Sequence, residues 1–225
     1  MLEAYKIRWF EKVFAIYNRN LLRRRFHSLQ VSGLNFLEDK SNDTPSIIYA
    51  NHSSWWDGLI FLELLRRFNF ENYVIMEEKQ LSNLFFFRWL GAFSVVREKP
   101  REAIKSINYA ADLLRENPNR MLLIFPQGEI LPNDARPLRF YNGIARIIEK
   151  ANKTCSFPAA LRYEFLGNYK PEIFIKIGKP ERIEGISDFN SKKLTGNFEK
   201  RLTDTLDELK QNIILNNRTE YVKLF

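Results

Sequence analysis

The sequence predicts an α/β protein with an amphipathic helical segment at its N-terminus. Short apolar runs alternate with segments of helical periodicity along most of the chain, which is the pattern of an α/β sheet. The 225 residues are 45% hydrophobic, enough to bury the core of one such domain. Residues 1–30 differ from the rest in charge and aromatic content, so we expect a boundary after residue 30 and one domain over 31–225.

The N-terminal segment combines aromatic and basic side chains. It holds seven of the lysines and arginines against two glutamates, and so accounts for most of the formal net charge of +8. In a helix, one broad face is apolar and carries Trp9, Phe10, Val13, Phe14, Ile16, Tyr17 and Leu21. Basic residues gather along one edge of that face. Such a helix either lies in the interface of an anionic membrane or packs on its own domain, and the sequence leaves both readings open.

The rest of the chain divides into alternating elements. Apolar runs predict strands at 46–50, 73–76, 93–96, 121–125, 157–161 and 173–177. Periodic segments predict helices at 55–68, 100–117, 143–151 and 198–213. Between them lies an aromatic stretch, residues 84–90, which is expected either in the core or against a lipid chain.

Composition excludes several classes of protein. The single cysteine, Cys155, cannot form an internal disulfide, and with only two histidines a four-ligand zinc site is not expected. The longest uncharged stretch, 44–56, is too short to span a bilayer, and early charges argue against a signal peptide. No nucleic-acid-binding motif is present, so the basic surplus favours an anionic membrane or substrate, and we expect no nucleic-acid partner.

The residues most suited to chemistry follow the first predicted strand. His52 comes shortly after this strand, and Asp57 follows five residues later. If the chain turns between them, the carboxylate can orient the imidazole, which then acts as a general base toward a hydroxyl. The segment 54–57 is also a capping-box pattern, in which Asp57 would only satisfy the first turn of a helix. The spacing alone favours the capping interpretation.

Four segments together resemble one enzyme family. Residues 51–57, reading N-H-S-S-W-W-D, resemble the N-H-x4-D signature of the glycerolipid acyltransferases, which include the 1-acylglycerol-3-phosphate acyltransferases. Three later segments are similar to the family's other blocks and fall in the same order: 91–97, 125–128 and 157–161. After the second of these come Leu138, Phe140 and Gly143, spaced as in the family's L-x-F-x-x-G. Each block is weak alone, whereas four in order, spanning about half the chain, are specific.

The resemblance implies both a fold and a reaction. The fold is a single mixed sheet flanked by helices, of the glycerol-3-phosphate acyltransferase type. The reaction moves a fatty acyl group from acyl-CoA or acyl carrier protein to a lipid hydroxyl, most often that of 1-acylglycerol-3-phosphate in phospholipid biosynthesis. His52 and Asp57 would be catalytic, with no metal or resident cofactor. The protein would act in the cytoplasm, peripherally on the inner face of the membrane, with residues 1–30 as the contact and 31–225 as the acyltransferase domain.

The residues themselves are consistent with direct transfer. There is no G-x-S-x-G elbow, and Cys155 has no evident histidine partner, so no covalent acyl-enzyme is indicated. The resemblance and local chemistry together nominate five residues for substrate binding: Asn51, Arg97, Gln127, Gly128 and Glu129. Among these, Arg97 stands where the family places an arginine for the acceptor phosphate, and a guanidinium suits that task.

The third block departs from the family and leaves the acceptor open. Where the family reads F-P-E-G-T-R-S, this chain has Gln127, Glu129 and Ile130, and so gains a carboxylate and loses an arginine. Glu129 then either binds hydroxyls of an uncharged lipid, such as a glycolipid or glycosylated carotenoid, or pairs with Arg136 or Arg139. A lipid-binding relative without turnover and a thioester hydrolase are the remaining alternatives.

Overall fold

A computed structural model describes residues 1–40, 43–185 and 189–225. The strands are β1 (Ser28–Ser32), β2 (Ser46–Ala50), β3 (Glu71–Glu77), β4 (Ala92–Val95), β5 (Arg120–Ile124), β6 (Lys153–Glu164), β7 (Glu172–Ile177), β8 (Glu181–Glu184) and β9 (Val222–Lys223). The helices are α1 (Arg8–Arg25), α2 (Leu34–Glu38), α3 (Asp57–Leu65), α4 (Glu78–Asn83), the 3₁₀ helix η1 (Phe85–Leu90), α5 (Pro100–Glu116), α6 (Gly143–Ala151) and α7 (Ser191–Ile214).

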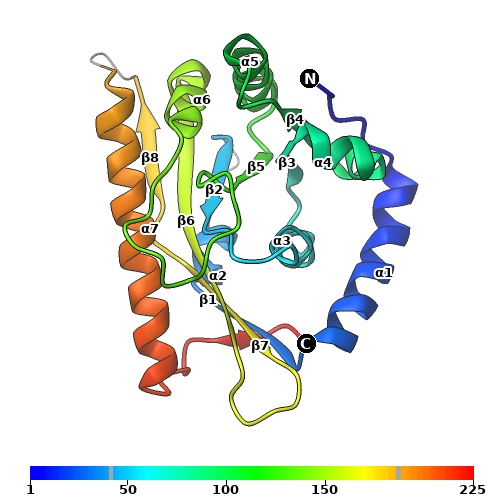
Figure 1. Ribbon diagram of the computed structural model, residues 1–225, viewed down its shortest axis with the longest axis vertical. Helices are drawn as coiled ribbons and strands as arrows, with labels where there is room; N and C mark the ends of the chain where they lie inside the picture. The colour runs from blue at the N-terminus through cyan, green and yellow to red at the C-terminus, as the bar shows by residue number, and fades with distance from the viewer. Residues whose placement is uncertain (41–42, 186–188) are drawn as a thin grey trace.

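Within these described ranges the strands form one sheet of nine. Its order is β4-β3-β5-β2-β6-β7-β1-β9, and β8 pairs with one end of β6 (Figure 1). Strands β4, β3, β5, β2 and β6 are mutually parallel, whereas β7 and β8 run antiparallel to β6. The prediction of an α/β fold with a single mixed sheet flanked by helices is therefore confirmed.

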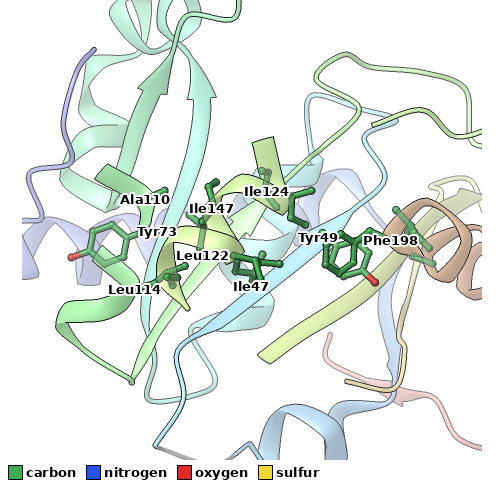
Figure 2. Close-up of a cluster of buried hydrophobic side chains, with 14 of the residues drawn as sticks. Ile47, Tyr49, Tyr73, Ala110, Leu114, Leu122, Ile124, Ile147 and Phe198 are labelled. Atoms are coloured by element: carbon green, nitrogen blue, oxygen red, sulfur yellow. The ribbon is translucent and has the colours of Figure 1, made fainter. Parts of the chain in front are cut away.

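Helices cover both faces of the sheet. On β2, Ile47 and Tyr49 face the side covered by α5, α6 and α7, while Ile48 and Ala50 face the side covered by α1, α2 and α3. Figure 2 shows the first of these clusters, where the Tyr49 ring lies against that of Phe198 with centroids 5.0 Å apart. Burial on both sides explains why the central strands read as continuous apolar runs in the sequence.

Several elements were not expected from the sequence. Strand β1 is one of them, and it pairs in parallel with β7 over its whole length. The boundary expected after residue 30 falls inside this strand, so residues 28–30 belong to the sheet. Strand β8 reads Glu-Arg-Ile-Glu, which has too little apolar content to be recognised, and β9 has only two residues.

Helix α1 has two apolar faces. Toward the domain, Phe10 and Phe14 contact the η1 rings of Phe86 and Trp89, and the Asn18 side chain donates to the Leu59 carbonyl oxygen at 2.9 Å. The opposite face is exposed and carries Trp9, Val13, Ile16 and Tyr17, with Trp9 65% exposed. The helix therefore packs on its domain and still presents apolar side chains outward. Among the described helices, none is long and apolar enough to cross a membrane.

Candidate active site

His52 and Asp57 meet at the carboxyl edge of the sheet. His52 follows β2, and the chain turns so that α3 begins at Asp57. Imidazole Nδ1 lies 2.8 Å from carboxylate Oδ2, which also accepts the backbone N–H groups of Ser53 and Ser54 at 2.7 and 2.9 Å. Asp57 is fully buried, whereas the His52 side chain is 22% exposed. The carboxylate thus orders the turn and orients the imidazole, so the two interpretations of Asp57 hold together.

A tyrosine on β6 holds the other carboxylate oxygen. The Tyr163 hydroxyl donates to Asp57 Oδ1. Burial, together with the neighbouring Asp57 carboxylate, raises the pKa of the Tyr163 phenol, which keeps it a hydrogen-bond donor. The Tyr163 ring also packs on Phe26, with centroids 5.7 Å apart, and Phe26 in turn contacts Trp56. Asp57 therefore has partners on both oxygens and little freedom to move.

Two amide side chains fix the backbone around His52. Gln127, which is buried, accepts the His52 backbone N–H on Oε1 at 2.9 Å. Asn51 pairs with the backbone of Leu161 on β6, through bonds of 2.8 and 2.9 Å. In place of the substrate contact expected for Asn51, its side chain joins β2 to β6. Both residues thus fix the position of His52, and the accepting atom of Gln127 is an oxygen that the family's glutamate also has.

Arg97 and Gly128 form a second group beside the dyad. Arg97 Nη1 donates to the Gly128 carbonyl oxygen, and Nη2 lies 3.7 Å from a Glu77 carboxylate oxygen. The guanidinium also stacks 5.4 Å from the centroid of the Tyr141 ring. Gly128 has a φ of +74°, and a Cβ at this position would lie 2.8 Å from Tyr141 Cε2. Glycine is therefore needed for the turn and for the close approach of Arg97.

Glu129 and Arg146 border the same cavity as His52, Arg97 and Gly128. Both are exposed, and neither makes an ion pair with any residue that the structure describes. Arg136 pairs instead with Asp207 at 2.6 Å, so the expected pairing of Glu129 with Arg136 or Arg139 is not formed. The loop is pinned elsewhere, by the Asp134 carboxylate, which accepts from Arg162 and Lys210 at 3.0 Å each.

An apolar cavity of about 400 Å³ opens beside His52. The His52 side chain lines it, and its ring stacks on Phe125 with centroids 4.4 Å apart. Arg97 and Gly128 border the same opening, and the interior is aliphatic and aromatic, lined by Leu59, Leu62, Val74, Met76, Leu84, Phe87, Leu90, Val95, Ile107, Ile124, Ile144 and Ile147. The volume and lining suit an alkyl chain better than a polar ligand.

Some residues of the aromatic stretch 84–90 line the cavity, and others pack in the interior against α1. Phe87 and Leu90 line the cavity, whereas Phe86 and Trp89 pack against α1. Phe85 is exposed.

Sequence reasoning missed Tyr163 and Arg146. Tyr163 lies 106 positions from Asp57, and its only local sign is a place just beyond the fourth block. Arg146 reads as one polar position on an amphipathic helix, and its place at the cavity follows from the packing of α6. The positioning roles of Gln127 and Asn51 were also hidden, because their partners come from other strands.

The site is thus a hydrogen-bonded Asp–His pair at the carboxyl edge of a mixed sheet, with the histidine lining an apolar cavity. Residues 28–162 match the family model described as Acyltransferase, and because they make up more than half of the chain, the chain belongs to the acyltransferase family. The family resemblance inferred from the sequence is thereby confirmed.

Comparison with individual proteins adds the fold. No curated protein sequence matches the chain. Among solved structures, the chain is similar to the crystal structure of PlsC, the 1-acyl-sn-glycerophosphate acyltransferase of Thermotoga maritima. The TM-score is 0.64 at 18% sequence identity, and the match covers 90% of this chain and 80% of that one. At this identity the likeness shows a shared fold.

Proposed function

We propose that this protein transfers a fatty acyl group from acyl-CoA or acyl carrier protein to the hydroxyl of a lipid. The observation that carries the proposal is the hydrogen bond between Asp57 and His52, whose side chain lines the apolar cavity. The pair supplies a base, and the cavity supplies room for an acyl chain next to it. Family membership supports the same reaction.

The proposed step needs only the side chains described above. Because Nδ1 of His52 bonds Asp57, Nε2 is the nitrogen left to accept the proton of the acceptor hydroxyl. The oxygen attacks the thioester carbonyl carbon, the C–S bond breaks, and the departing thiolate takes the proton from the imidazolium. Asp57 stabilises the imidazolium between these events. No metal or resident cofactor takes part in this scheme.

The leading acceptor is 1-acylglycerol-3-phosphate. Arg97 and Arg146 border the same cavity, and Arg97 is held by a carbonyl oxygen, a 3.7 Å ion pair and the Tyr141 ring. Two guanidinium groups suit a phosphate, and Arg146 offers a cation that Ile130 does not. The PlsC to which the chain is similar is named for this acceptor.

Glu129 favours a second candidate acceptor. Its carboxylate borders the cavity without a cationic partner in the described part of the chain, so it is free to accept hydrogen bonds from hydroxyls. A glycolipid or a glycosylated carotenoid would offer such hydroxyls. The lining carries two glutamates, Glu77 and Glu129, beside the two arginines, and the two guanidinium groups make phosphate the first choice.

The proposal places the protein peripherally on the inner face of the membrane, in contact through residues 1–30. The outward face of α1 supports this, because Trp9, Val13, Ile16 and Tyr17 are exposed while Arg8, Lys12 and Arg23 flank them. Apolar burial and attraction to anionic lipid would act together there.

Thiol release from long-chain acyl-CoA tests the proposal. The wild type and His52→Ala are assayed with lysophosphatidate and with a mixed membrane-lipid extract, and mass spectrometry identifies the product. Release that depends on His52 with lysophosphatidate supports the phosphate acceptor, and release only with the extract supports the second candidate. Free fatty acid as the sole product indicates a hydrolase. No turnover with either acyl-CoA or acyl carrier protein contradicts the proposed enzyme and leaves a lipid-binding relative.

A further inference from the structure

The hairpin between β6 and β7 ends in an exposed apolar tip. The tip is residues 165–170, and three of its side chains are apolar and solvent-exposed. Phe165 is 70% exposed and Tyr169 is 98% exposed, and Leu166 lies beside them. Figure 1 shows this hairpin extending beyond the rest of the sheet. So many exposed apolar groups in so short a loop are unfavourable in water and indicate a partner.

Exposed positive charges lie beside the tip. The Lys170 ammonium group donates to the carbonyl oxygen of Arg23, in the last turn of α1, which carries three exposed arginines: Arg23, Arg24 and Arg25. Two carboxylates flank the loop: Glu164 pairs with Arg162, and the buried Glu172 accepts from Ser28 and Gln30. Because the three arginines and Lys170 outnumber these two carboxylates, the apolar tip fits an anionic bilayer, where aromatic rings lie among the headgroups.

The tip is also continuous with the active site and with α1. Tyr163, which donates to Asp57, lies two residues before Phe165, a separation of about 7 Å along a strand. At the other end of the hairpin, the His27 backbone N–H donates to the Pro171 carbonyl oxygen at 2.9 Å. One short loop therefore connects the catalytic edge of the sheet to the end of the proposed membrane helix.

We infer that the β6–β7 tip is a second membrane contact that inserts Phe165, Leu166 and Tyr169 into an anionic bilayer. The inference rests on the proposed membrane association of α1 and extends it to a distant part of the sequence. Insertion at the tip holds the catalytic edge next to the headgroups, where a lipid acceptor has a short path from the bilayer to His52.

Vesicle binding by paired variants tests the inference. The double variant Phe165→Ser/Tyr169→Ser is compared with the control Ile214→Ser/Leu215→Ser. The control removes two exposed apolar residues at the end of α7, which packs on the sheet face opposite to α1. With vesicles of phosphatidylcholine and phosphatidylglycerol in a two-to-one ratio, the tip variant is expected to bind about tenfold more weakly, and the α7 variant like wild type. Turnover of short-chain, fully soluble substrates should be unchanged in both variants, because neither pair borders the cavity.

A fluorescent label reports insertion directly. In a Cys155→Ser background, Tyr169→Cys and Leu215→Cys are each labelled with an environment-sensitive dye, and only the dye at 169 is expected to shift to the blue on vesicle addition. If wild type binds vesicles while the tip variant binds equally well and the dye at 169 does not shift, the inference is wrong and the α1 contact stands. If wild type fails to bind, both are wrong.

Discussion

The two sides of the candidate active site are held very differently. On the dyad side, Asp57 is fully buried and has a hydrogen-bond partner on each carboxylate oxygen. On the rim side, Arg97 has one carbonyl partner and a 3.7 Å ion pair, while Glu129 and Arg146 are exposed. The dyad is fixed by backbone groups and neighbouring strands, whereas the rim consists of side chains on loops and on the first turns of α6.

Under the proposed function, this contrast assigns the chemical step to the dyad and the choice of acceptor to the rim. A base must be oriented before the substrate arrives, and a buried network provides that order. Selection of an acceptor needs side chains that can exchange solvent for substrate, which partly exposed groups on a rim allow. Variants on the dyad side are therefore expected to slow every substrate alike, and variants on the rim to act on some substrates more than others.

Removal of the base should have the largest effect. His52→Ala is expected to lower kcat by about 10³-fold, because it removes the imidazole that takes the proton in the proposed step. The melting temperature should stay close to that of wild type, since the His52 ring is partly exposed and lies at the cavity mouth. His27→Ala, which changes the other histidine on the surface, is the control and should retain full activity. A His52→Ala enzyme with most of its activity would contradict the assignment.

Gly128→Ala tests the rim next. Alanine at φ +74° is strained by about 1 kcal/mol, and its Cβ would crowd the Arg97 guanidinium and the Tyr141 ring. We expect KM for lysophosphatidate to rise about tenfold, with a smaller change in kcat. Gly185 has a similar φ, +56°, and no described residue lies within 4 Å of a Cβ added there, so Gly185→Ala reproduces the strain without the crowding. Equal effects of the two variants on KM would count against the role of Arg97.

Tyr163→Phe tests how far the dyad depends on its partner on β6. Loss of the hydroxyl leaves Asp57 Oδ1 without its donor in a buried site, which is expected to lower kcat about fivefold and stability by about 1–3 kcal/mol. Tyr73→Phe is the control. It removes a hydroxyl that lies outside the site and donates to Glu71 over 2.7 Å, and it should leave kcat unchanged. If Tyr163→Phe changes stability but not kcat, Tyr163 has only a structural role.

Asp134→Asn should have the smallest effect. Hydrogen bonds from Arg162 and then Lys210 lower the pKa of Asp134 to about 2, from an ordinary value of 3.8. The stabilisation from this lowered pKa is complete above pH 4 and is lost as pH falls toward 2. We expect Asp134→Asn to lower the melting temperature by about 2 °C at pH 7, because the carboxylate is mostly exposed, and the difference should disappear near pH 2. Asp112→Asn is the control, because it removes a carboxylate from an exposed ion pair with Arg115 within one helix, and it measures the change in melting temperature caused by loss of an exposed charge.

The contrast also explains what the sequence could predict. His52 and Asp57 are five residues apart, so their meeting follows from one turn after a strand, and the strong apolar runs predicted most of the sheet. Tyr163 and the Asn51–Leu161 pair join positions more than 100 residues apart, which local patterns do not encode. Strand β1 was missed because it directly follows the basic helix and its five residues, Ser-Leu-Gln-Val-Ser, show only weak alternation.

The most direct test of the account compares two acceptors in two variants. Lysophosphatidate and a monoacylglycerol with the same acyl chain are assayed with wild type, His52→Ala and Arg97→Ala. We expect His52→Ala to lower kcat/KM for both acceptors by the same large factor, and Arg97→Ala to lower it only for lysophosphatidate. If Arg97→Ala lowers both equally, or His52→Ala spares either one, the separation of a fixed dyad from a selective rim is wrong.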